Sequence, residues 1–181
     1  IATGSARRRT QILSVRPDLK LTNLRGNVDT RLRKLDENYW DGIIVAASAM
    51  HRLNRYDEIT EYLAPNIHVP APGQGALGLE IAEDRADMYE LLNIILDIDT
   101  TLCCRAERTF LKKLDGGCLV PVGCHARLKG NTFSITGYVS NEDGTDRILK
   151  TLEGKRENSA SLSNELAKEI LTLKSGHISA K

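Results

Sequence analysis

Residues 42–47 read Gly42-Ile43-Ile44-Val45-Ala46-Ala47, a continuous apolar run that favours the α/β class of fold. Strands of a parallel sheet are covered on both faces, so they read as unbroken apolar runs and not as alternating ones. A second strand is predicted at Leu19–Leu24, and the spacing predicts helices over Arg7–Val15, over Asn27–Asp36 and after residue 47. The sequence up to residue 69 therefore predicts strands that alternate with helices.

Proline and glycine residues gather directly after this region, and such a cluster predicts a crossing between domains. They are Pro65, Pro70, Pro72, Gly73 and Gly75. We expect an α/β lobe over residues 1–69, a connecting segment over residues 70–96 and a separate domain over residues 97–181. A strand is predicted at Ala76–Ile81, and since a parallel sheet needs strands on both sides of its centre, we expect its partners to lie outside this sequence.

The last part of the sequence has the pattern of a small α+β domain with a three-stranded sheet and helices. The predicted order is helix, three strands, helix, and the strands have the period of two that a half-buried sheet requires. The predicted helices are Arg85–Leu96, Thr101–Leu114 and Ser159–Leu173, and the predicted strands are Ala126–Leu128, Phe133–Val139 and Arg147–Leu152.

The composition is that of an ordinary globular protein, with 41% hydrophobic and 27% charged residues among 181. No apolar run approaches the roughly 18 residues that span a bilayer, and residues 1–9 lack the pattern of a signal peptide. We therefore expect no membrane partner and a cytoplasmic location. The four cysteines include the adjacent Cys103 and Cys104 and form no Cys-x-x-Cys pair, which favours reduced thiols and no metal site.

Positive charge is concentrated at the start of the chain. The first 34 residues contain nine lysines and arginines against two aspartates, a net charge of +7, whereas the whole chain carries +1. This concentration predicts an anionic partner. Carboxylates, phosphates and nucleic acid all satisfy that prediction, because the planar guanidinium group binds oxyanions through paired hydrogen bonds. The alternative is a solvated surface without a ligand.

Two turns place arginines where an anion can bind. Thr3-Gly4-Ser5-Ala6-Arg7-Arg8 leads into a helix, and the first main-chain amides of a helix bind anions. Basic residues in that first turn oppose the helix dipole, which favours a compensating anion. In the second turn Arg25 ends a strand, Gly26 permits a tight bend, and Arg31 lies one turn into the next helix, which Asn27 caps.

Ligands of open α/β sheets bind beyond the carboxyl ends of the strands. We therefore expect four arginines to converge on one crevice: Arg7, Arg8, Arg25 and Arg31. The alternative for Arg31 is a surface ion pair.

A glycine-flanked cysteine follows the helix predicted at Thr101–Leu114. The loop reads Gly116-Gly117-Cys118, and an accessible thiolate on such a loop serves as a nucleophile or an attachment point. The alternative for Cys118 is a small apolar residue at an ordinary helix end. Cys103 and Cys104 are predicted to be packing residues, and Cys124 is a less favoured candidate for attachment.

Five stretches of the sequence, in this order, resemble the successive signatures of the porphobilinogen deaminase (hydroxymethylbilane synthase) family. They are Ile1–Arg8, Leu24–Leu32, Pro70–Gly78, Ala106–Arg108 and Gly116–Gly123. The resemblance implies a periplasmic-binding-protein-like lobe at residues 1–69 (domain 2), a return segment of domain 1 at residues 70–96, and a cofactor-attachment domain at residues 97–181.

The resemblance also implies a function. Members of the family are transferases of tetrapyrrole and heme biosynthesis that condense four porphobilinogen molecules to hydroxymethylbilane and release ammonia. It implies a dipyrromethane primer joined by a thioether to Cys118. The residues implied to bind the carboxylates of the cofactor and of the growing pyrrole chain are Ser5, Arg7, Arg8, Arg25, Gly26 and Arg31. In the family the catalytic aspartate lies in domain 1. The resemblance therefore implies a monomeric carboxy-terminal fragment that lacks most of domain 1, contains no catalytic residue and is inactive alone.

The sequence departs from the family pattern at the first turn and at the cysteine. The family's Gly-Thr-Ser-Ser-Leu-Arg-Arg corresponds to residues 2–8, which lack one of its hydroxyl groups and keep Ser5, and Leu119 stands where glutamine is usual. Two other functions are considered: a stand-alone carboxylate-binding module without a covalent cofactor, and a nucleic-acid binder. The 4% aromatic content disfavours nucleic acid, because base stacking needs aromatic side chains.

Overall fold

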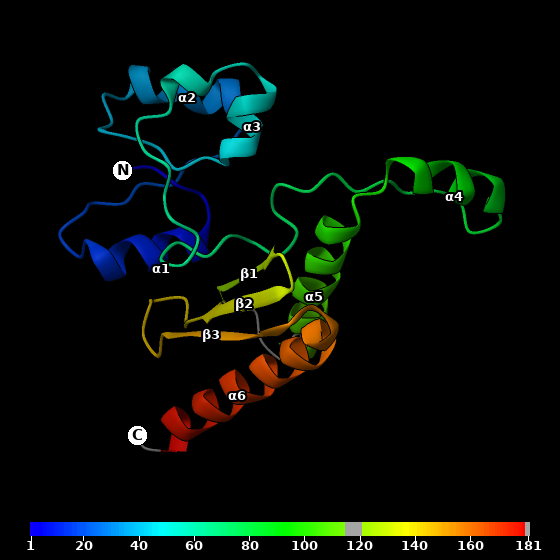
Figure 1. The fold of residues 1–181 in the computed structure, drawn as a ribbon. Helices are drawn as coiled ribbons and strands as arrows, with labels where there is room; N and C mark the ends of the chain where they lie inside the picture. The colour runs from blue at the N-terminus through cyan, green and yellow to red at the C-terminus, as the bar shows by residue number, and fades with distance from the viewer. Residues whose placement is uncertain (115–120, 180–181) are drawn as a thin grey trace.

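The computed structural model describes residues 1–114 and 121–179. An amino-terminal part carries α1 (Ala6–Val15), α2 (Val28–Glu37) and α3 (Ala47–Arg52), followed by the short 3₁₀ helix η1 (Tyr56–Glu58). A carboxy-terminal part consists of an antiparallel sheet and two long helices, and between the two parts α4 (Ala86–Leu92) projects away from the rest of the molecule (Figure 1).

Residues 1–3 form the centre of a minimal parallel sheet. Ala2 is fully buried and makes parallel bridges to Thr22 on one side and Ile43 on the other. The amide of Thr3 donates to the carbonyl oxygen of Thr22 at 2.9 Å, and the amide of Ala2 donates to that of Gly42 at 2.9 Å. The predicted strands at 19–24 and 42–47 are wrong in extent, because the central segment turns into α1 at Ala6 and offers few residues for pairing.

Capping side chains begin the first two helices, and the cap predicted at Asn27 is present. The side chain of Ser5 accepts a hydrogen bond from the amide of Arg8 at 3.4 Å at the start of α1. The side chain of Asn27 accepts one from the amide of Thr30 at 2.8 Å at the start of α2. Each contact satisfies one of the main-chain donors that the first turn of a helix leaves unpaired.

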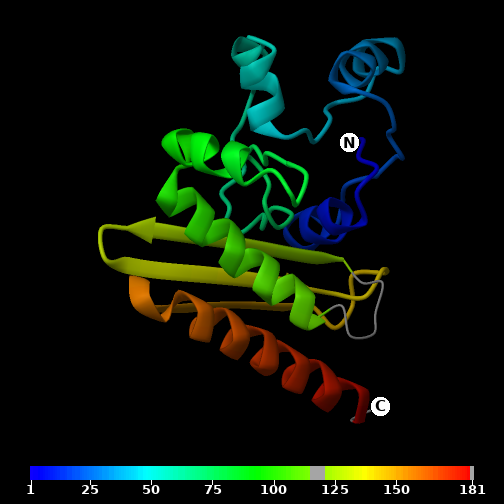
Figure 2. The ribbon, with the colours of Figure 1, turned by 90° about the vertical axis from the view of Figure 1, so that its right-hand side faces the viewer.

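The carboxy-terminal part has the predicted order of helix, three strands and helix. The strands β1 (Val122–Lys129), β2 (Thr132–Val139) and β3 (Ile148–Lys155) pair in the order β1-β2-β3. The helices α5 (Ile98–Leu114) and α6 (Ser159–Ser179) lie side by side against this sheet (Figure 2), with the short η3 (Arg156–Asn158) before α6. The core between the layers includes Phe110, Phe133, Ile135, Leu166 and Ile170.

Gly137 sets the distance between the sheet and the helices. A Cβ atom at this position would lie 2.7 Å from Cζ of Phe110 and 2.8 Å from Cδ1 of Ile170. The side chains of Phe110 and Ile170 therefore occupy the space that a side chain at Gly137 would need, and the core packs closely at this point of β2.

The residues between the two parts differ most from the prediction. Residues 76–81 pair with no strand of the described chain. Because the partners of this strand are expected outside the sequence, the strand stays a prediction. The helix predicted at 85–96 ends as α4 at Leu92 and continues only as the 3₁₀ turn η2 (Asn93–Ile95). The helix predicted from Thr101 begins earlier, at Ile98, where the side chain of Asp97 accepts from the amide of Thr100 at 2.7 Å.

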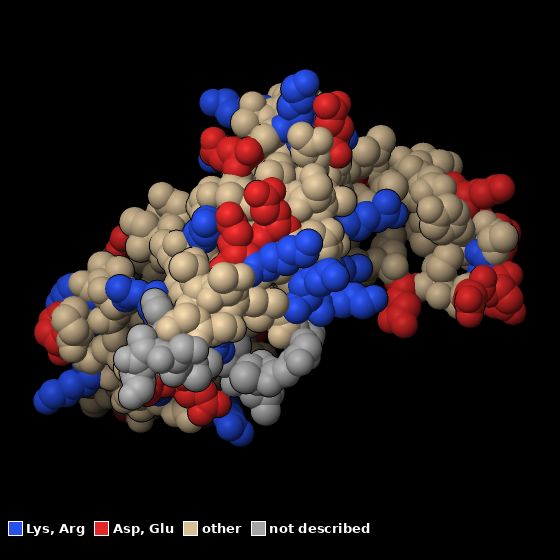
Figure 3. Space-filling model, turned by 90° about the horizontal axis from the view of Figure 1, so that it is seen from below, with Lys and Arg blue, Asp and Glu red and all other residues tan. Residues whose placement is uncertain are grey.

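This projecting segment exposes apolar side chains. The exposed ones are Leu77, Leu79, Tyr89, Leu91, Ile94, Ile95, Leu96 and Ile98. Acidic side chains gather at the end of the molecule that α4 forms (Figure 3).

Within residues 1–114 and 121–179, no helix has the length and apolar character needed to cross a bilayer.

Candidate anion-binding site

The first turn of α1 carries two half-buried arginines whose guanidinium groups are held by main-chain carbonyls. Nη1 of Arg7 donates to the carbonyl oxygen of Val69, and Nη1 of Arg8 donates to that of Ile44 at 2.6 Å. These contacts fix the direction of both side chains. A guanidinium group has five N–H donors, so each arginine keeps further donors for a ligand.

Arg31 joins these two arginines, and the cluster contains no acidic partner. Burial and, to a smaller extent, the nearby charge of Arg8 lower the pKa of Arg7 to about 10. Burial, followed by the charge of Arg31, lowers the pKa of Arg8. Among the described residues no carboxylate lies within 4.0 Å of any of the three guanidinium groups. The cluster is therefore an uncompensated positive site, which an anion would stabilise.

The second turn holds Arg31 in place. Nε of Arg31 donates to the carbonyl oxygen of Gly26 at 2.8 Å, and Gly26 has a φ angle of 125°, which side-chain-bearing residues rarely adopt. In the described chain Arg31 forms no ion pair. Arg25 is exposed, and only its carbonyl oxygen has a described contact, with Nζ of Lys34 at 3.3 Å. The structure thus brings together three of the four predicted arginines, and it shows no contact between Arg25 and the other three.

Two residues near the cluster were not singled out from the sequence. Gln11, buried on α1, binds the main chain of Val69 in both directions: its Nε2 donates to the carbonyl oxygen at 3.0 Å, and its Oε1 accepts from the amide at 2.7 Å. His68 precedes Val69, and its Nε2 is buried without a hydrogen-bond partner in the described chain. The contacts of Gln11 and the burial of His68 both depend on the packing of residues 68–69 against α1. No local pattern in the sequence therefore predicts them.

Residues 69–73, here called the strap, connect this site to the sheet. The carbonyl oxygen of Pro70 accepts a hydrogen bond from the amide of Cys124 in β1 at 3.0 Å. The amide of Gly73 donates to Oε2 of Glu107 at 2.5 Å, while Oε1 of the same carboxylate accepts from the amide of Ala126 at 2.8 Å. Glu107 is thus a buried link between the strap and β1, a role that its place in the Ala106–Arg108 motif did not reveal.

Comparison with known proteins agrees with this geometry. Residues 1–90 match the family model described as porphobilinogen deaminase, dipyromethane cofactor binding domain, and residues 101–172 match the one described as porphobilinogen deaminase, C-terminal domain. The chain belongs to the porphobilinogen deaminase family. The resemblance inferred from the five sequence stretches is therefore confirmed, and all the clustered arginines lie within the cofactor-binding match.

Curated porphobilinogen deaminases from several bacteria are similar to this chain. It is 44% identical over 172 residues to the protein from Nitratidesulfovibrio vulgaris strain Hildenborough, which covers 94% of this chain and 55% of that protein. It is 43% identical over 171 residues to the protein from Syntrophotalea carbinolica, and this match covers 94% of this chain and 54% of that protein. It is 40% identical over 171 residues to the protein from Syntrophobacter fumaroxidans, and this match covers 94% of this chain and 55% of that protein. The chain thus spans about half the length of the curated relatives it matches.

The donors at the anion-binding site fit the family's dipyrromethane cofactor. A cofactor that carries carboxylates needs several cationic donors without acidic neighbours, and the cluster of Arg7, Arg8 and Arg31 supplies them beside the first amides of α1. Ser5 caps the same helix start, so its hydroxyl group also lies at the site.

None of the described cysteines has the properties of an attachment thiol. Cys124 is fully buried, and burial strongly raises the pKa of its thiol. Cys103 packs against the core, and burial also raises the pKa of Cys103 and of Cys104. A raised pKa leaves little thiolate near neutral pH. Cys118, with its neighbours Gly116, Gly117 and Leu119, lies outside the described residues.

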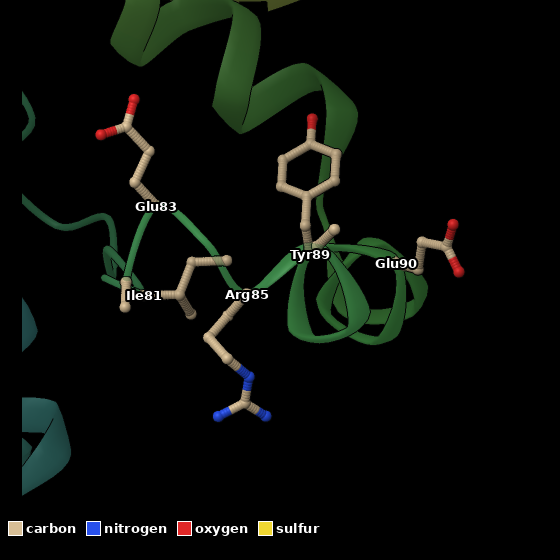
Figure 4. A pocket seen from close by; sticks show the side chains of 7 residues that line it. Ile81, Glu83, Arg85, Tyr89 and Glu90 are labelled. Carbon is tan, nitrogen blue, oxygen red and sulfur yellow. The ribbon is translucent and has the colours of Figure 1, made fainter.

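Other parts of the described chain offer no comparable site. Ile81, Arg85 and Tyr89 line a hollow beside α4, but the side chains of Glu83, Arg85 and Glu90 diverge there instead of meeting (Figure 4). In residues 1–114 and 121–179 no group of three or more His, Cys, Asp or Glu side chains is placed to hold a metal ion.

Proposed function

We propose that this chain is the part of a porphobilinogen deaminase that holds the dipyrromethane cofactor and the growing pyrrole chain. The complete enzyme condenses porphobilinogen units to hydroxymethylbilane and releases ammonia, a transferase reaction of tetrapyrrole and heme biosynthesis. The observation that carries this proposal is the cluster of Arg7, Arg8 and Arg31, which have no carboxylate partner in the described chain.

Each residue of the site has a proposed role in binding that follows from its position. Arg7 and Arg8 are directed by the carbonyl groups of Val69 and Ile44, and they bind carboxylates of the cofactor or of the pyrrole chain. Arg31, held by Gly26, binds a further carboxylate, and the exposed Arg25 attracts anions. Ser5 contributes its hydroxyl group at the helix start. When bound, the cofactor supplies the primer to which porphobilinogen is added.

Cys118 is the proposed attachment residue. The family resemblance implies attachment at the cysteine of the Gly-Gly-Cys loop, and the thiols of Cys103, Cys104 and Cys124 are all disfavoured by burial. The only other cysteine in the sequence is Cys118. We therefore infer that the thioether forms at this residue.

The domain arrangement is part of the proposal. We infer that residues 1–69 form domain 2, a lobe like those of periplasmic binding proteins, and that residues 97–181 form the cofactor-attachment domain. Residues 70–96 would return into domain 1, because their exposed apolar side chains need a covering surface. The proposed enzyme is cytoplasmic and monomeric, and its catalytic aspartate lies in domain 1.

The mass of the purified chain tests the proposal. An excess mass of dipyrromethane size, mapped by peptide analysis to Cys118 and lost in Cys118→Ser but not in Cys104→Ser, supports cofactor attachment. An unmodified chain that remains unmodified after incubation with porphobilinogen and the rest of the enzyme would favour the stand-alone carboxylate-binding module instead. The chain alone should form no hydroxymethylbilane.

A further inference from the structure

His68 lies against the first turn of α1. Its amide donates to the carbonyl oxygen of Ala64 at 2.8 Å, and the next residue, Val69, is bound to α1 through Gln11 and Arg7. The positive charges of Arg7 and Arg8 act on the imidazole ring, which is half-buried. The main chain that carries the ring is therefore held against the helix of the two arginines.

The second ring nitrogen has no partner. Nε2 of His68 is buried, and the described residues provide no hydrogen bond to it. A buried polar atom without a partner costs free energy, so its presence calls for a reason. The charged groups that face the ring are Arg7 and Arg8, both from α1. Burial, and then these two positive charges, lower the pKa of His68, so the ring is neutral in the ligand-free protein near pH 7.

We propose that His68 is a positioning residue of the anion-binding site, which takes up a proton from solvent when a carboxylate binds to Arg7 and Arg8. The inference rests on the proposed function, because it requires that these arginines bind carboxylates. The bound anion offsets the positive charges that hold the ring neutral. The protonated ring then adds a positive charge behind the two guanidinium groups and strengthens their hold on the ligand.

This arrangement predicts a definite sign for the pH dependence. An anion stabilises the charged form of a nearby imidazole, so the bound state holds more protons than the free state. Affinity for the anion must then rise as pH falls. An opposite charge at close range shifts an imidazole by about one pKa unit, which corresponds to an increase in affinity of at most about tenfold, reached only at a pH below both pKa values.

Isothermal titration calorimetry of the chain with porphobilinogen tests the proposal. Titrations at pH 7 in buffers of different ionisation enthalpy give the number of protons taken up on binding, and titrations at pH 6 and pH 8 give the change in affinity. The carboxylates of porphobilinogen stay ionised over this range, since such groups titrate near pH 4. Wild type should take up a fraction of a proton and bind more tightly at pH 6.

Two variants separate His68 from the other titrating groups. His68→Asn keeps a polar group near the position of Nδ1 but removes the titrating ring, so it should bind porphobilinogen without proton uptake. His51→Asn removes an exposed imidazole that contacts only Tyr62 and Tyr56, and it should behave as wild type. Equal proton uptake in wild type and His68→Asn, or binding without uptake in wild type, would overturn the inference. If wild type does not bind porphobilinogen at all, the proposed function is overturned as well. Arg8→Gln serves as the control for nonspecific heat, because it should lose most of the heat that comes from binding at the arginine site.

Discussion

The hydroxyl group of Tyr138 in β2 donates a hydrogen bond to the hydroxyl oxygen of Thr10 in α1 at 2.9 Å, across 128 residues of sequence. Both side chains are buried. The contact joins the helix that begins at the anion-binding site to the face of the sheet opposite α5 and α6. Thr10 in turn donates to the carbonyl oxygen of Arg7 at 3.2 Å, so the sheet is coupled to the arginine turn by two successive hydrogen bonds.

Tyr138→Phe should lower the free energy of unfolding by about 1 kcal/mol, because it removes one buried hydrogen bond and leaves the ring in place. Chemical denaturation with urea measures the change. Tyr39→Phe is the matched control, since Tyr39 is 94% exposed and forms no such contact. Equal stability of both variants would show that the Tyr138 contact adds nothing to the docking of α1.

Arg8→Gln should weaken porphobilinogen binding by about ten- to a hundredfold, as expected for the loss of a charge-assisted hydrogen bond worth about 1.5–3 kcal/mol. Calorimetry or equilibrium dialysis measures the dissociation constant, with the melting temperature checked in parallel. Arg33→Gln on α2 removes the same charge from an exposed ion pair with Glu37 and should leave binding within about twofold. Equal losses in both variants would mean that only the overall positive charge attracts the ligand.

Glu107 should make stability depend on pH in a specific direction. Burial raises the pKa of its carboxyl group, although the amides of Ala126 and Gly73 act in the opposite sense. A carboxyl group with a raised pKa binds its proton more tightly in the folded chain, so its contribution to stability decreases as pH rises from below 4.5 through the raised value. His125, with Nδ1 at 3.9 Å, provides no opposing charge near pH 7, because burial lowers its pKa.

The measurement is the free energy of unfolding of wild type and Glu107→Gln across this pH range. The stability of wild type relative to the variant should fall as pH rises, because glutamine does not ionise. Glu157→Gln, at an exposed position, is the control and should show no such trend. A constant difference between wild type and Glu107→Gln at all pH values would contradict the prediction.

Gly4→Ala should destabilise the amino-terminal part by about 1–3 kcal/mol, since a Cβ atom there would lie 2.3 Å from the carbonyl oxygen of Leu24. The strain falls on the turn that carries Ser5 and Arg7, so porphobilinogen binding should weaken with it. Gly78→Ala is the matched control, because nothing lies within 4 Å of the added atom. The melting temperatures of the two variants are measured by circular dichroism, and only that of Gly4→Ala should fall. An unchanged melting temperature of Gly4→Ala would refute the close contact.

Much of the local structure followed from the sequence. Asn27 predicted the start of α2, because a capping side chain is a local signal that needs no distant partner. The period of two between residues 126 and 152 predicted the three strands, and the apolar spacing predicted α5 and α6 with shifted ends. The family resemblance followed from short motifs in register, and the family-model matches confirm it.

The strands of the amino-terminal part show where local patterns fail. Residues 42–47 are apolar enough for a full strand, yet only Ile43 forms a bridge, because the length of a strand depends on how many residues its neighbour offers. Residues 76–81 carry the pattern of a strand without any neighbour in the described chain. A strand is a relation between two segments, which one segment alone does not specify.

By itself, the sequence determined the cap at Asn27, the carboxy-terminal order of elements, the concentration of arginines and the family. Only the tertiary structure decided which arginines influence one another: the charges of Arg7, Arg8 and Arg31 interact, while Arg25 is exposed. It also assigned Gln11, His68 and Glu107 to the surroundings of the site. The reason is physical, because hydrogen bonds across the fold and the burial of charge depend on distances between residues far apart in the chain, whereas caps and periodicities are set by neighbours.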